Sequence, residues 1–78
     1  MIRIYADFNH CDEAGRVRLD TIGSLADIRK HEGALTEGLV VLLYMEDEFE
    51  VEGTLYFENG WLAVPDHSTL RYLDGTEP

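Results

Sequence analysis

Cysteine and long apolar stretches are scarce in this chain of 78 residues, and each scarcity excludes a class of protein. Cys11 is the only cysteine, so no disulfide can form within the chain, and a lone thiol is typical of a reducing compartment. The longest apolar run, 39–45, is far too short to cross a bilayer, which takes about 20 residues. Residues 1–7 alternate between polar and apolar, unlike a signal peptide. We therefore expect a cytoplasmic protein.

Basic residues are also few. Lysine and arginine together number 6 against 16 aspartates and glutamates, which gives a net charge of −10. Residues 37–78 hold ten of these acids and a single base, Arg71. Nucleic acids and anionic membranes are bound through basic surfaces, so we expect neither as a direct partner. A basic protein is the natural complement of such a chain, and the alternative is that the acidity serves solubility alone.

Apolar and polar residues alternate with a period of two through much of the chain, which predicts β-strands. The clearest case is 49–57, where Val51, Gly53 and Leu55 would face the core together with the phenylalanines at both ends. Gly53 at an inward position predicts a bulge or a sharp bend, as small barrels use at their corners. The other predicted strands are 2–8, 16–20, 39–45 and 61–64.

One short helix is expected at about 24–32. Ser24 is a good N-cap, Asp27 three residues later favours the helix start, and Gly33 can end the helix in the left-handed conformation. Between the last two strands, the dipeptide 59–60 is Asn-Gly, which predicts a two-residue type I′ turn.

These elements predict a mainly β fold: a small, five-stranded, partly open barrel with one short helix. The length allows one domain, which we place at 1–73, followed by a disordered tail at 74–78. A nearly closed barrel has the advantage that few strand edges stay exposed.

The order of the predicted elements resembles the Src-homology-3-like barrel. The stretch 35–74, with its bent strand at 51–55, is also similar to the Sm-like fold. Sm-like proteins place their helix before the first strand, whereas here it follows two predicted strands, which favours the first resemblance. The chain further resembles a set of small uncharacterised bacterial proteins, which implies a stand-alone domain and no particular activity. The segments that carry this further resemblance are 5–9, 15–19, 35–38 and 61–66.

Metal-ligand residue types gather in the loop 7–13, but their order does not fit a known site. The loop begins like a calcium-binding loop, yet Asp12 and Arg18 stand where that loop needs glycine and a bidentate glutamate. We expect a solvated turn instead, in which Asn9 and Asp12 bond to nearby backbone amides.

Cys11 is the residue on which a zinc site or a thiol nucleophile would depend. Zinc would need His10 and His67 as further ligands, but the chain lacks the paired ligand spacing of zinc sites. His10 adjoins Cys11 and would point to the opposite face of a strand, whereas a catalytic pair must meet. Ser24 and Ser68 lack a Gly-x-Ser-x-Gly elbow. We therefore expect no catalytic residues, no bound metal and no cofactor: the chain is not an enzyme.

Acidic and aromatic residues on the outward side of the predicted sheet form the candidate site. Acids next to aromatic rings can hold arginine or lysine by charge-assisted hydrogen bonds and cation–π contacts. Src-homology-3-like barrels bind basic, proline-rich segments with this chemistry. The alternative is that the rings cover the small core while the acids are solvated. The predicted partner-binding residues are Tyr5, Tyr44, Glu48, Glu50, Glu52, Tyr56 and Trp61.

The expected function is therefore that of a non-catalytic protein-interaction module, presenting an acidic, aromatic surface to a basic partner. Two alternatives remain open. The outward face can pair with a second copy, in an Sm-like or dimeric assembly that supplies the burial a small domain lacks. The acidic second half can also imitate a nucleic-acid backbone and inhibit a basic enzyme.

Overall fold

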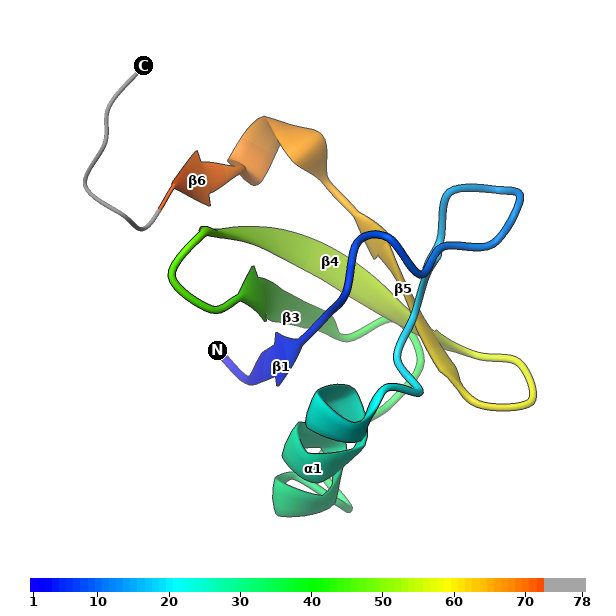
Figure 1. Cartoon of the computed structure of the whole chain (residues 1–78). Helices are drawn as coiled ribbons and strands as arrows, with labels where there is room; N and C mark the ends of the chain where they lie inside the picture. Colours follow the sequence, from blue (N-terminus) through cyan, green and yellow to red (C-terminus); the bar gives the residue numbers. More distant parts are fainter. Residues whose placement is uncertain (73–78) are drawn as a thin grey trace.

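The computed structural model describes residues 1–72; residues 73–78, which hold the predicted tail and the end of the predicted domain, lie outside the described residues. The chain forms one sheet curled into a half-barrel of five strands, with an α-helix packed beside it (Figure 1), which confirms the predicted mainly β fold. In the described part, no helix is long and apolar enough to cross a membrane. The elements in chain order are β1 (Arg3–Tyr5), β2 (Val17–Arg18), α1 (Ile22–Lys30), β3 (Val40–Met45), β4 (Phe49–Phe57), β5 (Trp61–Pro65), the 3-10 helix η1 (His67–Thr69) and β6 (Arg71–Tyr72).

The strands follow the order β1-β3-β4-β5-β2 across the sheet, and β6 pairs with β4. β1 runs parallel to β3, while the other pairs are antiparallel. β4 pairs with β3 over 49–54 and with β5 over 53–57, so Gly53 and Thr54 have a strand on both sides. A Cβ atom at Gly53 would lie 2.6 Å from Leu43 Cδ1 and 3.4 Å from the Val64 carbonyl oxygen, so glycine is what lets the strands approach so closely.

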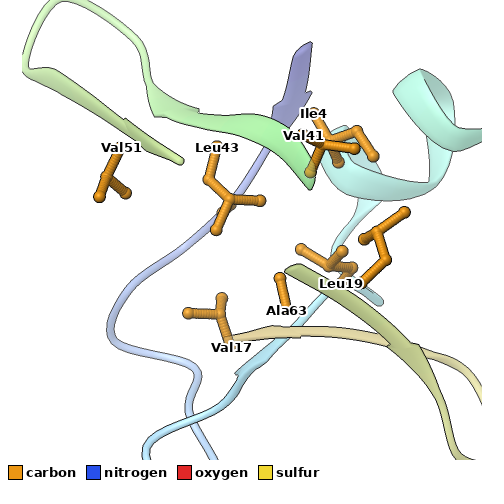
Figure 2. Packing of buried hydrophobic residues seen from close by; sticks show 9 residues of the cluster. Ile4, Val17, Leu19, Val41, Leu43, Val51 and Ala63 are labelled. Atoms are coloured by element: carbon orange, nitrogen blue, oxygen red, sulfur yellow. The ribbon is translucent and has the colours of Figure 1, made fainter. Parts of the chain in front are cut away.

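Buried apolar side chains fill the concave side of the sheet (Figure 2). Val51 and Leu55 lie there, as the alternation predicted. The prediction that Phe57 faces the core is wrong: Phe57 is 54% exposed, because it lies at the end of β4 and packs edge-on against Trp61, with ring centroids 5.1 Å apart. The core residues are Ile4, Ala6, Val17, Leu19, Val41, Leu43, Val51, Leu55 and Ala63.

The helix begins earlier than predicted, at Ile22, and ends at Lys30. Its N-cap is Thr21, whose hydroxyl accepts a hydrogen bond from the Ser24 amide at 3.2 Å. Ser24 and Asp27, which resembled an N-cap and a first-turn acid, lie inside the helix and are buried because both contact β1. The error arises because the same residue types serve as caps and as tertiary hydrogen-bond partners.

The last hairpin forms where it was predicted, but with a longer loop. The strand register pairs Phe57 with Trp61, so three residues separate β4 from β5 rather than two. Asn59 and Gly60 both adopt positive φ angles, 57° and 135°, which explains why these two residue types stand here.

The first two strands are shorter than the predicted 2–8 and 16–20. The chain turns after β1 because the Asp7 carboxylate accepts a hydrogen bond from the Asn9 amide and the Asp7 carbonyl accepts one from the His10 amide, both at 2.9 Å. The turn carries Phe8 towards the start of β4, where its ring meets Phe49.

Candidate partner-binding surface

The seven predicted binding residues do not form one surface. Tyr5, Tyr44 and Glu50 lie together on neighbouring strands, in register across the face of the sheet that points away from the core. Glu48 belongs to the turn between β3 and β4.

Glu52 follows Glu50 on the same face of β4, whereas the other two predicted residues lie near the β4–β5 hairpin. Glu52 is half-buried, and its backbone amide donates to the Thr69 hydroxyl at 2.8 Å. Tyr56 is exposed near the β4–β5 hairpin. Trp61 packs against the core and, edge-on, against Phe57. Trp61 therefore covers the core, as the alternative interpretation of the aromatic residues held.

Glu50 corrects the prediction of a solvated acidic strand face. It points away from the core, as predicted, yet its side chain is only 8% exposed. Its carboxylate forms ion pairs with Arg3, at 3.7 Å, and with Arg71 of β6. The Arg3 guanidinium also lies 4.3 Å from the centre of the Tyr44 ring. Glu50 and Tyr44 were predicted to bind a basic side chain of a partner. The chain's own arginines occupy both of them instead.

Asp27 of α1 ties the helix to the outer edge of the sheet. Its Oδ2 accepts hydrogen bonds from the Tyr5 amide at 2.9 Å and from the Tyr44 hydroxyl at 2.7 Å. The Ser24 hydroxyl donates to the Tyr5 carbonyl. Two helix side chains therefore satisfy both backbone groups of Tyr5, as a neighbouring strand would.

This contact shifts the pKa of both side chains. Burial would raise the pKa of Asp27, but the hydrogen bonds from Tyr44 and Tyr5, with the charge of Lys30, outweigh burial and hold that pKa below its ordinary value of 3.8. The hydrogen bond to Asp27, followed by burial and the negative charge of Asp27, raises the pKa of Tyr44 to about 12.

The contact between Asp27 and Tyr44 should make the stability of the fold depend on pH, both in acid and in alkali. As the pH falls below about 4, the unfolded chain protonates Asp27 before the folded chain does, so the contribution of Asp27 to stability is lost in acid. The contribution of Tyr44 is complete below pH 10 and is lost as the pH rises towards 12, because the unfolded phenol ionises first. Urea unfolding between pH 9 and 12 should show this alkaline loss in the wild type and in Tyr56→Phe, but not in Tyr44→Phe. An equal alkaline loss in Tyr44→Phe would contradict the assignment.

The turn Glu46–Glu48, called the acidic turn below, holds three acidic side chains that are not used in the ion pairs of the sheet. Its three residues are exposed, and Asp47 adopts a left-handed conformation with a φ of 61°. Within residues 1–72, four of the six lysine and arginine side chains pair with acids elsewhere, and none lies within ion-pair distance of this turn. The turn therefore keeps its full negative charge facing solvent. The four paired bases are Arg3, Arg16, Lys30 and Arg71.

The acidic turn borders one hollow of the surface and leads along the chain to a second. At its start, Glu46 lines an open groove of about 550 Å³ together with Tyr5, Tyr44 and the strongly exposed Ile22 of α1. At its end, the turn leads into Phe49, the first residue of β4, which lines a second hollow. The three acids themselves do not line this second hollow, so only the groove is bordered by the turn directly.

The second hollow, called the aromatic pocket below, is a feature that the sequence pattern did not reveal. It has a volume of about 450 Å³ and a mainly apolar lining. Phe49 lies at its centre, with ring centroids 5.1 Å from Phe8 and 6.4 Å from Tyr72. Its main lining residues are Phe8, Cys11, Phe49, His67, Leu70 and Tyr72.

The loop before β2 contains the residues considered for metal binding and catalysis. Asp12 Oδ1 accepts hydrogen bonds from the Ala14 and Arg16 amides, each at 2.9 Å, so the predicted turn forms around Asp12. The Cys11 thiol is exposed and donates to the Phe8 carbonyl at 3.2 Å. Cys11 and His67 do line the same pocket, but no cluster of three metal-ligating side chains occurs in residues 1–72.

Comparison with known proteins returned no match to this chain among family models, curated proteins or solved structures.

Proposed function

We propose that this chain is a non-catalytic, cytoplasmic protein-interaction module whose acidic turn binds a basic segment of a partner protein. The observation that supports the proposal is the position of the turn: its three exposed acids form no ion pair within residues 1–72, Glu46 lines the groove that also holds Tyr5 and Tyr44, and Glu48 directly precedes Phe49 of the aromatic pocket. Carboxylates attract lysine and arginine, while the adjoining hollows offer apolar surface to the alkyl stems and to neighbouring side chains.

The ion pairs of the fold favour this turn over the rest of the acidic half. Glu50 is occupied by two arginines, and Arg16 links Asp12 to Glu58. A nucleic-acid mimic needs free acids spread along a surface at phosphate-like spacing. Here several acids that such a surface would need are neutralised by ion pairs within the chain. The acids that remain free suit a short basic segment better than the extended basic groove that a nucleic-acid mimic would occupy.

The strand edges argue against the alternative of self-association by sheet extension. At β1, the backbone groups of Tyr5 bond to Asp27 and Ser24. At the far end of β4, the Phe57 amide donates to the Glu37 carboxylate at 2.9 Å. A backbone group that already has a hydrogen-bond partner cannot readily pair with the strand of a second copy. Proteins avoid edge-to-edge pairing by covering their strand edges in this way.

A pair of matched charge variants tests the proposal. Glu46→Gln with Glu48→Gln removes two charges from the acidic turn, whereas Glu13→Gln with Glu32→Gln removes two exposed charges elsewhere. We expect a capped tetralysine peptide to bind the wild type, and to bind the turn variant about fivefold more weakly, since two exposed pairs of about 0.5 kcal/mol each contribute about 1 kcal/mol together. Backbone amide shifts in a titration at low salt give the affinity.

The control variant should bind the peptide as the wild type does, and high salt should release the peptide from both, because exposed charges are screened. Equal weakening in the two variants would mean that net charge alone attracts the peptide. An absence of binding at low salt would overturn the proposed function.

A further inference from the structure

The aromatic pocket is built from segments far apart in the sequence. Phe8 comes from the turn after β1, Phe49 from the start of β4, and Leu70 and Tyr72 from the segment after β5. Its volume of about 450 Å³ lies within the range of pockets that bind small ligands or single side chains. The pocket is therefore large enough, and apolar enough, to bury a side chain of a partner.

The wall formed by the C-terminal segment is held firmly against β4. The Glu52 amide donates to the Thr69 hydroxyl, the Asp66 amide donates to the Glu52 carbonyl at 2.8 Å, and Arg71 pairs with Glu50. These bonds fix the wall before any ligand arrives. A pocket that needs no ordering on binding loses less conformational entropy when it is filled.

Acids next to the pocket in the chain favour one kind of occupant. Glu48 directly precedes Phe49, and the other two acids of the turn come just before it, although none of the three lines the pocket itself. An apolar ligand with an anionic head, such as a fatty acid, would be repelled there, whereas an apolar side chain flanked by lysine or arginine would satisfy both the pocket and the turn.

We infer that the aromatic pocket receives one apolar side chain of the basic segment that the acidic turn binds. This inference rests on the proposed function and specifies its ligand: a basic segment with an aliphatic or aromatic anchor, rather than a purely basic one. The acids would attract the segment, and burial of the anchor would give the complex its selectivity.

Two peptides that differ at one position test the inference. One is capped and has a leucine between two pairs of lysines, and the other has serine in place of that leucine. We expect the leucine peptide to bind about tenfold more tightly, as burial of most of a leucine side chain predicts. Its shift changes should include the amides of Phe8 and Leu70, which the serine peptide should leave unchanged.

A variant that fills the pocket provides the matching control on the protein. Leu70→Trp places a large ring at a partly exposed pocket residue, whereas Leu25→Trp makes the same change on the exposed face of α1. Leu70→Trp should remove the tenfold preference for leucine, and Leu25→Trp should keep it. Circular dichroism of both variants checks that they fold, and the shift changes in the wild type give a readout that needs no variant.

The outcomes separate this inference from the proposed function. Equal affinity for the two peptides, or a leucine preference that survives in folded Leu70→Trp, would overturn the pocket inference while leaving the acidic turn as the binding site. Failure of both lysine peptides to bind would overturn the proposed function and the inference with it.

Discussion

The Glu50→Lys substitution is expected to destabilise the fold by about 4 kcal/mol, because an ammonium group would be buried beside two arginines. The side chain at this position is 8% exposed, and the guanidinium groups of Arg3 and Arg71 lie against it. A chain of 78 residues has a total stability of roughly 4–12 kcal/mol, so the substitution would remove from about a third of that stability to all of it. Urea unfolding followed by the fluorescence of Trp61 measures the loss.

Glu52→Lys is the matched control, since it makes the same charge change on the same face of β4 at a half-buried position. We expect it to cost less than about 1 kcal/mol. Similar losses for the two variants would show that the burial of Glu50 and its pairing with the arginines contribute little. The comparison also shows why Glu50 is unsuitable as a test of partner binding: its substitution changes the fold first.

The Gly53→Val substitution is expected to cost about 3 kcal/mol, because the added side chain would overlap the fully buried Leu43. Its Cβ alone would lie 2.6 Å from Leu43 Cδ1, and the core around Leu43 leaves little room to move. Valine is a better strand former than glycine, so a gain in stability would be expected if this close approach did not exist.

A double-mutant cycle with Leu43→Ala identifies the cause of that loss. Leu43→Ala removes the atom with which the new side chain would overlap, so the two substitutions together should cost clearly less than the sum of their separate effects. Thermal unfolding of the three variants and the wild type gives the coupling. Additive losses would place the strain elsewhere in β4.

Local alternation was enough to predict β4, and with it most of the fold. Val51 and Leu55 are buried, as the period of two indicated. These predictions succeed because the direction of a side chain on a strand depends only on its position in that strand. The prediction for Phe57 is wrong because a strand can extend past the edge of the core. A side chain at the end of such a strand is then exposed, even where the alternation assigns it to the core side.

Glu50 and Asp27 could not be predicted in the same way. Alternation correctly directs Glu50 away from the core, but whether that side is solvated depends on β6, a strand of two residues that is too short to show any pattern. Asp27 fits the pattern of a helix start, while its hydrogen bonds reach 22 residues back along the chain to Tyr5. In both cases a partner distant in sequence decides the environment of the side chain.

The aromatic pocket is a further case of this kind. Phe8, Phe49 and Tyr72 come together only through the turn after β1 and the return of the chain over β4. The sequence shows aromatic residues at these positions, but it contains no signal that their rings meet. The acidic turn, in contrast, was visible from the sequence as a run of three acids between two strands.

The pairing of Glu50 with both Arg3 and Arg71 has a consequence for any shortened form of the chain. Arg71 follows Glu50 by 21 positions and lies beyond Ala63, the last residue of the buried core. A chain cut before Arg71 would therefore keep every core residue, but it would leave the Glu50 carboxylate with Arg3 alone and would remove the Tyr72 ring from its contact with Phe49. Trimming at this end would thus loosen the fold without touching its core.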